Sequence, residues 1–273
     1  MSFTPRYALT LGEVSILHVG GKELGERGRR GFTVEELAQI HKNLLSKGAN
    51  AEHVKISDAL PEELQSAHAA SVLVIRDGAA LICGDAAAAD KMLEEQQSIP
   101  YDKKFWNARQ KKTMHKRARY NTTFAEHDVA PSEDFQTPST HAFPPTLAAF
   151  RNGLASVLGD KAAGLSAEGN HYFEPKSGIG YHGDAERKIV ICLSLGGSSV
   201  LRYHWRMPGS SEHTLSPVDV RVSHGDVYVM SEKATGFDWK YRSRVRVVHG
   251  AGSDKYIKPR KSRAAAGAKR KRK

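Results

Sequence analysis

The chain has 273 residues, of which 40% are hydrophobic and 26% charged, a composition typical of a folded globular protein. It contains no run of about 18 apolar residues, so we expect no membrane-spanning helix. Its start lacks the charged and then apolar pattern of a secretory signal. The two cysteines, Cys83 and Cys192, exclude a disulfide framework, so we expect a nuclear or cytoplasmic protein that is not secreted.

The net charge of +11 is concentrated at the C-terminus. Residues 258–273 hold nine Lys and Arg and no acid, and subtracting these nine from +11 leaves +2 for the rest of the chain. Such a segment cannot bury enough apolar surface, so we predict a disordered basic tail. Its composition suits a nuclear-localisation signal or a phosphate-binding arm, and the alternative is a solubilising terminus.

Residues 1–98 predict a small α/β N-terminal domain, a scaffold or a partner-binding module. Thr33 and Glu36, three residues apart, have the pattern of a capping box, which predicts a helix that runs to about Lys47. The apolar, β-branched run 71–75 is typical of a buried strand. The pair Asp77-Gly78 then predicts a hairpin turn before a further strand.

Residues 99–257 have a different character. The segment 103–120 is strongly basic and carries aromatic residues, and the spacing of apolar residues predicts a helix over 146–158. Short strand candidates separated by turns then follow: 189–195, 200–205, 218–222, 226–230 and 244–248. This spacing indicates an α+β protein in which the small domain precedes either a β-sandwich or a double-sheet jelly roll, that is, a double-stranded β-helix.

The triplet His182-Gly183-Asp184 is the main chemical feature. In an extended segment, side chains two residues apart point to the same face, so His182 and Asp184 can hold one metal ion together. A distant histidine would complete the two-histidine-one-carboxylate triad of non-haem Fe(II) oxygenases, which leaves coordination positions open for a co-substrate and O₂.

The surroundings of this triplet resemble AlkB-like 2-oxoglutarate- and Fe(II)-dependent dioxygenases, including viral and phage relatives. The resemblance covers about residues 100–256. It rests on motifs in a fixed order: Asn170-His-Tyr172, the H-x-D pair, a strand that ends Ser194-Leu-Gly196, Gly225-Asp226-Val-Tyr-Val-Met230 and Trp239.

The resemblance implies an enzyme with Fe(II) as its cofactor, 2-oxoglutarate as its co-substrate and O₂ as its oxidant. Asn170 and Tyr172 would bind the carboxylates of 2-oxoglutarate, and Arg117, Arg119 and Tyr120 would border the substrate. The reaction would be hydroxylation or demethylation of nucleic-acid bases, which need a flipped or single-stranded nucleotide.

The third iron ligand departs from the family pattern. The family places a histidine shortly after the tryptophan, where this chain has Tyr241. We assign the ligand to His249, which alternates with Val245 and Val247 and would share their inward face. The rival interpretation is an incomplete ligand set in which His249 only makes a hydrogen bond in the core.

The far carboxylate of 2-oxoglutarate also needs a cation, and an arginine fork suits it best. In the family this residue follows the last ligand. Lys255 and Arg260 fit that order if His249 is the ligand, and Arg244 fits it if Tyr241 occupies the ligand site.

Nucleic acid, DNA or RNA, is the partner that the basic tail and the basic-aromatic segment 103–120 favour. A first alternative is hydroxylation of a protein side chain by the same fold, which agrees with the near-neutral body. A second is a non-catalytic nucleic-acid-binding protein with a degenerate jelly roll, for which Tyr241 is the main support.

Overall fold

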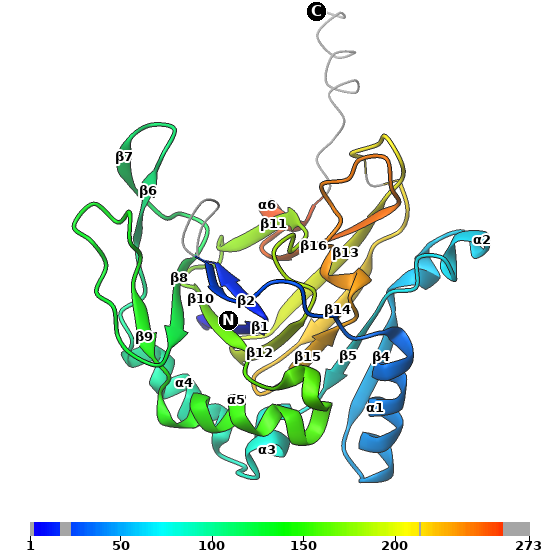
Figure 1. The fold of residues 1–273 in the computed structure, drawn as a ribbon, viewed down its shortest axis with the longest axis horizontal. Coiled ribbons are helices and arrows are strands. Elements are labelled where there is room, and N and C mark those ends of the chain that lie inside the picture. Colours follow the sequence, from blue (N-terminus) through cyan, green and yellow to red (C-terminus); the bar gives the residue numbers. More distant parts are fainter. Residues whose placement is uncertain (1–2, 17–22, 213, 259–273) are drawn as a thin grey trace, which may run out of the picture.

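The computed structural model describes residues 3–16, 23–212 and 214–258 (Figure 1). The fold is α+β and consists mostly of strands, in two main sheets. The helices are α1 (Val34–Ser46), α2 (Glu62–Gln65), α3 (Gly78–Cys83), α4 (Ala88–Ser98), α5 (Pro145–Leu158) and α6 (Asp254–Ile257). None of the helices in these described parts of the chain is long and apolar enough to cross a bilayer.

The larger sheet has eight strands in the order β4-β5-β15-β12-β1-β10-β8-β9. Their bounds in chain order are β1 (Arg6–Gly12), β4 (Ala51–Lys55), β5 (Ser71–Ile75), β8 (Tyr120–Ala125), β9 (Thr140–Ala142), β10 (Ser166–Tyr172), β12 (Val190–Gly196) and β15 (Val227–Met230). Neighbouring strands are antiparallel, except that β8 and β9 are parallel.

The smaller sheet has four strands in the order β11-β16-β13-β14. Their bounds are β11 (Gly178–His182), β13 (Ser199–Arg206), β14 (Val218–Val222) and β16 (Arg246–Gly252). Two hairpins complete the strands: β2 (Val14–Ile16) with β3 (Glu23–Gly25), and β6 (Lys104–Asn107) with β7 (Lys112–His115).

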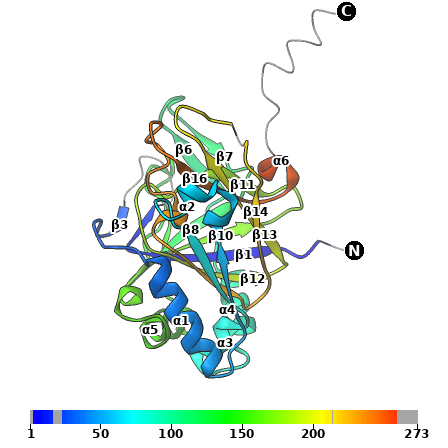
Figure 2. The same ribbon diagram turned by 90° about the vertical axis from the view of Figure 1, so that its right-hand side faces the viewer.

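Two apolar cores lie on opposite faces of the larger sheet. One contains Leu9, Leu193 and Phe150 and joins the sheet to α1, α3, α4 and α5, which gather along one side of it in both views (Figures 1 and 2). The other contains Val74 from the larger sheet and Trp205 from the smaller sheet. The two sheets therefore pack face to face, an arrangement compatible with a β-sandwich.

The predicted division into domains 1–98 and 99–257 is not what the structure shows. Strand β1 pairs with β10 on one side and with β12 on the other, and β5 pairs with β15. Strands from residues 1–98 therefore complete the same sheet as strands from the later segment. The backbone groups of β1 find their hydrogen-bond partners more than 150 positions later in the chain, so no independent N-terminal unit remains.

Several local predictions are confirmed. Thr33 and Glu36 form the capping box at the start of α1, with the Glu36 backbone N–H donating to Thr33 Oγ1 at 3.1 Å. Strand β5 is buried at every position, as the run 71–75 indicated. Helix α5 lies at the predicted place and buries its apolar stripe.

The hairpin predicted at Asp77-Gly78 is wrong. Asp77 has a φ of +50° and leads directly into α3, which replaces the expected second strand. Gly78 is needed there because a Cβ would lie 2.8 Å from the Val227 side chain. The disorder predicted for the tail 258–273 falls almost entirely outside the described residues.

Candidate metal centre

The two histidines of the predicted triad come from neighbouring strands. His182 is the last residue of β11, and His249 lies directly opposite it on β16. Residues paired in this way project their side chains from the same face of the sheet. Their ring centroids are 4.6 Å apart, so the strand register alone brings the two imidazoles together.

Asp184 reaches the same point from the loop that follows β11. The sequence had suggested an extended strand at this position. Its backbone N–H donates to the Thr235 carbonyl at 2.9 Å. A Cβ on Gly183 would lie 2.2 Å from the Gly236 carbonyl oxygen and 2.7 Å from Trp239 Cδ1. Glycine is therefore required between the two ligands, because the Gly236–Trp239 segment presses against this loop.

The three side chains are arranged as ligands of a common centre. His182 Nε2 lies 3.7 Å from Asp184 Oδ1, and His249 Nε2 lies 4.0 Å from Asp184 Oδ2. One ligand atom from each residue lies within 4.8 Å of the others, so the three could hold a metal ion. His182 Nδ1 is 2.8 Å from the Gly180 carbonyl, a partner that favours a proton on Nδ1 and leaves Nε2 free to bind.

The charges of these groups also fit a metal. Burial lowers the pKa of His182, and burial with the neighbouring His182 lowers that of His249 to about 3, so both rings are neutral at pH 7. Burial opposes ionisation of Asp184, but the charge of Arg187 outweighs it and holds the pKa of Asp184 below its usual value. Two neutral imidazoles and one carboxylate are the donor set of a facial triad.

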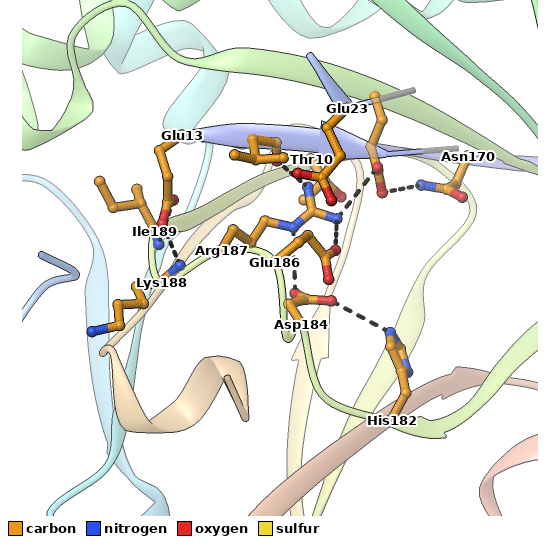
Figure 3. A network of polar contacts seen from close by, with 12 residues as sticks. Thr10, Glu13, Glu23, Asn170, His182, Asp184, Glu186, Arg187, Lys188 and Ile189 are labelled. Atoms are coloured by element: carbon orange, nitrogen blue, oxygen red, sulfur yellow. Dashed lines mark hydrogen bonds and ion pairs between the residues drawn. The ribbon is translucent and has the colours of Figure 1, made fainter. Parts of the chain in front are cut away.

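Arg187 fixes the ligand loop to the larger sheet (Figure 3). Its side chain is buried, with Nε 3.8 Å from Asp184 Oδ2 and Nη2 3.3 Å from Glu168 Oε2 and 3.2 Å from Glu186 Oε1. Burial disfavours its charge, but these carboxylates outweigh the burial and raise its pKa. Nothing in the local sequence singled out this arginine, because its partners converge from separate parts of the chain.

Glu13 supports the same loop from the end of β1. Its two carboxylate oxygens accept from the backbone N–H groups of Lys188 and Ile189, at 2.5 and 2.8 Å (Figure 3). The loop that carries Asp184 is thus held on both sides of Arg187. Thr235 binds the backbone of Asp184, and Glu13 binds the backbone of Lys188 and Ile189.

The predicted co-substrate residues Asn170 and Tyr172 are both buried on β10 and share the face that looks toward the smaller sheet. Asn170 Oδ1 accepts from Arg119 Nε at 2.5 Å, and its Nδ2 lies 3.4 Å from Glu168 Oε1. Glu168 lies two residues before Asn170 on β10, so the alternation of side chains along a strand could have placed it on the same face.

The three predicted substrate residues do not lie together. Arg119 is close enough to His182 and Asp184 to affect their pKa values. Tyr120 stacks on Phe173, with centroids 4.0 Å apart, and packs against the core under the helices, on the other face of the sheet. Arg117 is exposed.

Two of the three cations predicted for the far carboxylate are exposed on the surface. Arg244 is exposed, with its guanidinium 4.8 Å above the Tyr241 ring, and lines a surface hollow beside His68. Lys255 is exposed on α6 and lies 5.2 Å above the Tyr256 ring. Arg260 lies outside the described residues.

Tyr241 itself is 57% exposed and does not occupy a ligand position. His249, on the strand that follows, instead lies with His182 and Asp184 in a group that could hold a metal ion.

A cavity that the sequence did not indicate lies between the sheets next to Tyr172. It has a volume of about 40 Å³ and is lined by residues that include Arg6, Tyr172, Ser194 and Tyr228. Arg6 was missed because a single arginine at the start of a strand carries no motif. The alternation along β1 could have indicated it. Tyr7, Leu9 and Leu11 point into the core under the helices, so Arg6, Ala8 and Thr10 point to the other face of the sheet.

Comparison with known proteins gives one informative relationship. No protein-family model matches the chain. A protein of Acanthamoeba polyphaga mimivirus described as "Uncharacterized protein R156" is 32% identical over 246 residues, which are 88% of this chain and 93% of that protein. Similarity at this level over nearly the whole of both chains shows that this protein belongs to the same family as the mimivirus protein.

Proposed function

We propose that this protein is an AlkB-like Fe(II)- and 2-oxoglutarate-dependent dioxygenase that hydroxylates or demethylates nucleic-acid bases. The observation that carries the proposal is the convergence of half-buried His182 with buried Asp184 and His249. This donor set is the one used by non-haem Fe(II) oxygenases, and the two face-to-face sheets are compatible with a jelly-roll fold.

The iron, when bound with 2-oxoglutarate, would activate O₂ for insertion into a C–H bond. The residues of the chain would bind and orient. Neutral His182 and His249 present their nitrogen lone pairs, Arg187 holds Asp184 ionised and in place, and Asn170 positions the co-substrate from β10. Burial of Asp184 and His249 would limit the access of bulk water to the reacting groups.

The exposure of Tyr241 weakens the non-catalytic alternative. That alternative rested on a missing third ligand, and His249 lies close enough to His182 and Asp184 to serve as one. No feature of the described residues specifically favours a protein side chain as the substrate.

The β6–β7 hairpin supports a nucleic-acid substrate. It extends away from the body of the fold (Figure 1), and it carries exposed Lys104 and Lys112 with Trp106 between them in the chain. The same segment then leads to Arg119 beside the triad. A phosphate backbone bound along the hairpin would therefore run toward the metal centre.

Turnover tests the proposal directly. Fe(II)-loaded protein is incubated with 2-oxoglutarate and either methylated single-stranded oligonucleotides or methylated peptides, and succinate and formaldehyde are measured. We expect both products with oligonucleotides and neither in His182→Ala or Asp184→Ala. Stoichiometric iron binding without consumption of 2-oxoglutarate under any condition would refute the proposal, and turnover with peptides alone would move the substrate to protein.

The hairpin has a matched test. Lys104→Gln/Lys112→Gln is expected to weaken binding of a single-stranded oligonucleotide and to reduce the slope of log affinity against log salt by roughly 0.7 for each phosphate that the variant no longer neutralises. Lys42→Gln/Lys47→Gln removes the same charge from exposed positions at the other end of the fold and should change neither quantity. Equal effects of the two double variants would assign the binding to net charge and not to the hairpin.

A further inference from the structure

The cavity beside Tyr172 contains a cation without a counter-ion. Arg6 lies on β1, and its guanidinium carbon is 4.7 Å from the centre of the Tyr172 ring. Among the residues that the structure describes, no carboxylate pairs with it, and burial lowers its pKa while only Tyr172 opposes that effect. A partly buried guanidinium without an acid is unfavourable unless an anion from outside the chain joins it.

The shape of the cavity suits a small anionic group. A single water needs roughly 10–15 Å³ of such space, so a cavity of about 40 Å³ has room for a group the size of a carboxylate. The hydroxyl-bearing residues Tyr172, Tyr228 and Ser194 line it together with Arg6. Hydroxyl donors around a guanidinium fork are the groups that bind a carboxylate well.

The space between this cavity and the triad also contains a polar atom without a partner. Tyr203 is 1% exposed, and its hydroxyl makes no hydrogen bond within the described part of the chain. Its ring lies 5.7 Å from that of His249. Tyr203 pairs with His249 in the smaller sheet. Leu201 and Ala251 lie two residues further along the same two strands and line the cavity, so Tyr203 lies between the triad and the cavity.

We propose that Arg6, with Tyr172 and Tyr228, binds the terminal carboxylate of a dicarboxylic co-substrate whose other end reaches the metal centre. The inference rests on the proposed function and deepens it. It differs from what the family resemblance implies, because the cation comes from the first strand of the larger sheet and not from a residue after the third ligand.

Paired ligands test the assignment. 2-Oxoglutarate and 2-oxopentanoate have the same length, but only 2-oxoglutarate carries a second carboxylate. Their affinities are measured by calorimetry on the full-length protein loaded with Mn(II) under anaerobic conditions. We expect wild type to bind 2-oxoglutarate about 100-fold more tightly, since the other ligand cannot form the charge-assisted pair of hydrogen bonds.

Arg6→Gln should lower the affinity for 2-oxoglutarate by about 30- to 100-fold and that for 2-oxopentanoate by less than about 3-fold. Arg6→Lys, which keeps the charge but not the fork, should lower the affinity for 2-oxoglutarate about 10-fold and also serves if the glutamine variant does not fold. Arg221→Gln, at an exposed position on β14, is the control and should match wild type. Mn(II) affinity should be unchanged in all variants.

The outcomes separate this inference from the proposed function. Full discrimination between the two ligands in Arg6→Gln, or an equal loss of affinity for both, would overturn the role of Arg6 and leave the dioxygenase proposal standing. A wild type that binds Mn(II) but neither ligand would overturn both. Succinate offers a readout without metal: it should raise the unfolding temperature of metal-free wild type, and Arg6→Gln should abolish that rise.

Discussion

At the scale of single residues, His249 decides whether the candidate site offers a metal ion two ligands or three. We expect His249→Ala to lower Fe(II) affinity at least about 100-fold, as severely as His182→Ala, because a direct ligand matters at least as much as the groups that orient one. Tyr241→Phe should keep wild-type affinity, since Tyr241 is exposed. Anaerobic Fe(II) titration of the three variants measures this. Full iron occupancy in His249→Ala would place the third ligand elsewhere.

His171 predicts a pH dependence of stability. Its ring stacks on Tyr7, with centroids 4.3 Å apart, and burial followed by the charge of Lys103 lowers its pKa from 6.5 to about 4. Between these two values the unfolded chain binds a proton that the folded chain does not, so the free energy of unfolding falls as the pH is lowered from 6.5 toward 4. Above pH 6.5 the residue has no such effect.

The variant His171→Phe should remove part of this slope, on the order of 1 kcal/mol per pH unit and less than the full value for one proton, because the ring is only partly buried. Phenylalanine keeps the stacking on Tyr7. Urea unfolding of wild type and variant at pH 5 and pH 6 measures the difference. Identical pH slopes would mean that the ring is protonated in the folded state.

At the scale of elements, Arg187 joins the ligand loop to β10 and to the start of β2. Arg187→Gln would leave the Glu168 and Asp184 carboxylates buried without their cation, a change that typically costs about 3–5 kcal/mol. Because Arg187 also holds the pKa of Asp184 down, metal affinity in the variant should begin to fall at a higher pH than in wild type.

The matched control is Arg202→Gln, which breaks a partly exposed pair with Asp219 on the surface of the smaller sheet. An exposed pair of this kind contributes about 1 kcal/mol or less. Chemical denaturation of both variants compares them. Equal destabilisation by the two substitutions would mean that the network around Arg187 has no special role in the fold.

At the scale of the whole molecule, we expect that the basic tail can be removed without unfolding the rest of the chain. Deleting residues 258–273 removes nine of the positive charges. We expect weaker nucleic-acid binding at physiological salt and loss of nuclear accumulation, with an unchanged unfolding midpoint. Fluorescence localisation and a binding titration measure the two effects. Normal localisation together with normal binding would make the tail a solubilising terminus only.

The sequence by itself determined what depends on neighbours along the chain. The capping box at Thr33, the buried strand at 71–75 and the apolar stripe of α5 are all set by short-range patterns, and each was confirmed. The alternation of Val245, Val247 and His249 likewise placed His249 inward, where it is buried. These inferences succeed because periodicity and capping act over a few residues.

The tertiary structure alone decided which strands are neighbours, and with them the site. The pairing of β1 with β10 and β12 merged two predicted domains into one sheet and brought Arg6 beside Tyr172. The opposition of His182 and His249 depends on the register of β11 with β16. Such pairings join residues that are far apart in the chain, and local sequence cannot choose among them because any strand offers the same backbone hydrogen-bonding groups. Only packing of the side chains of both sheets together selects one partner and one register.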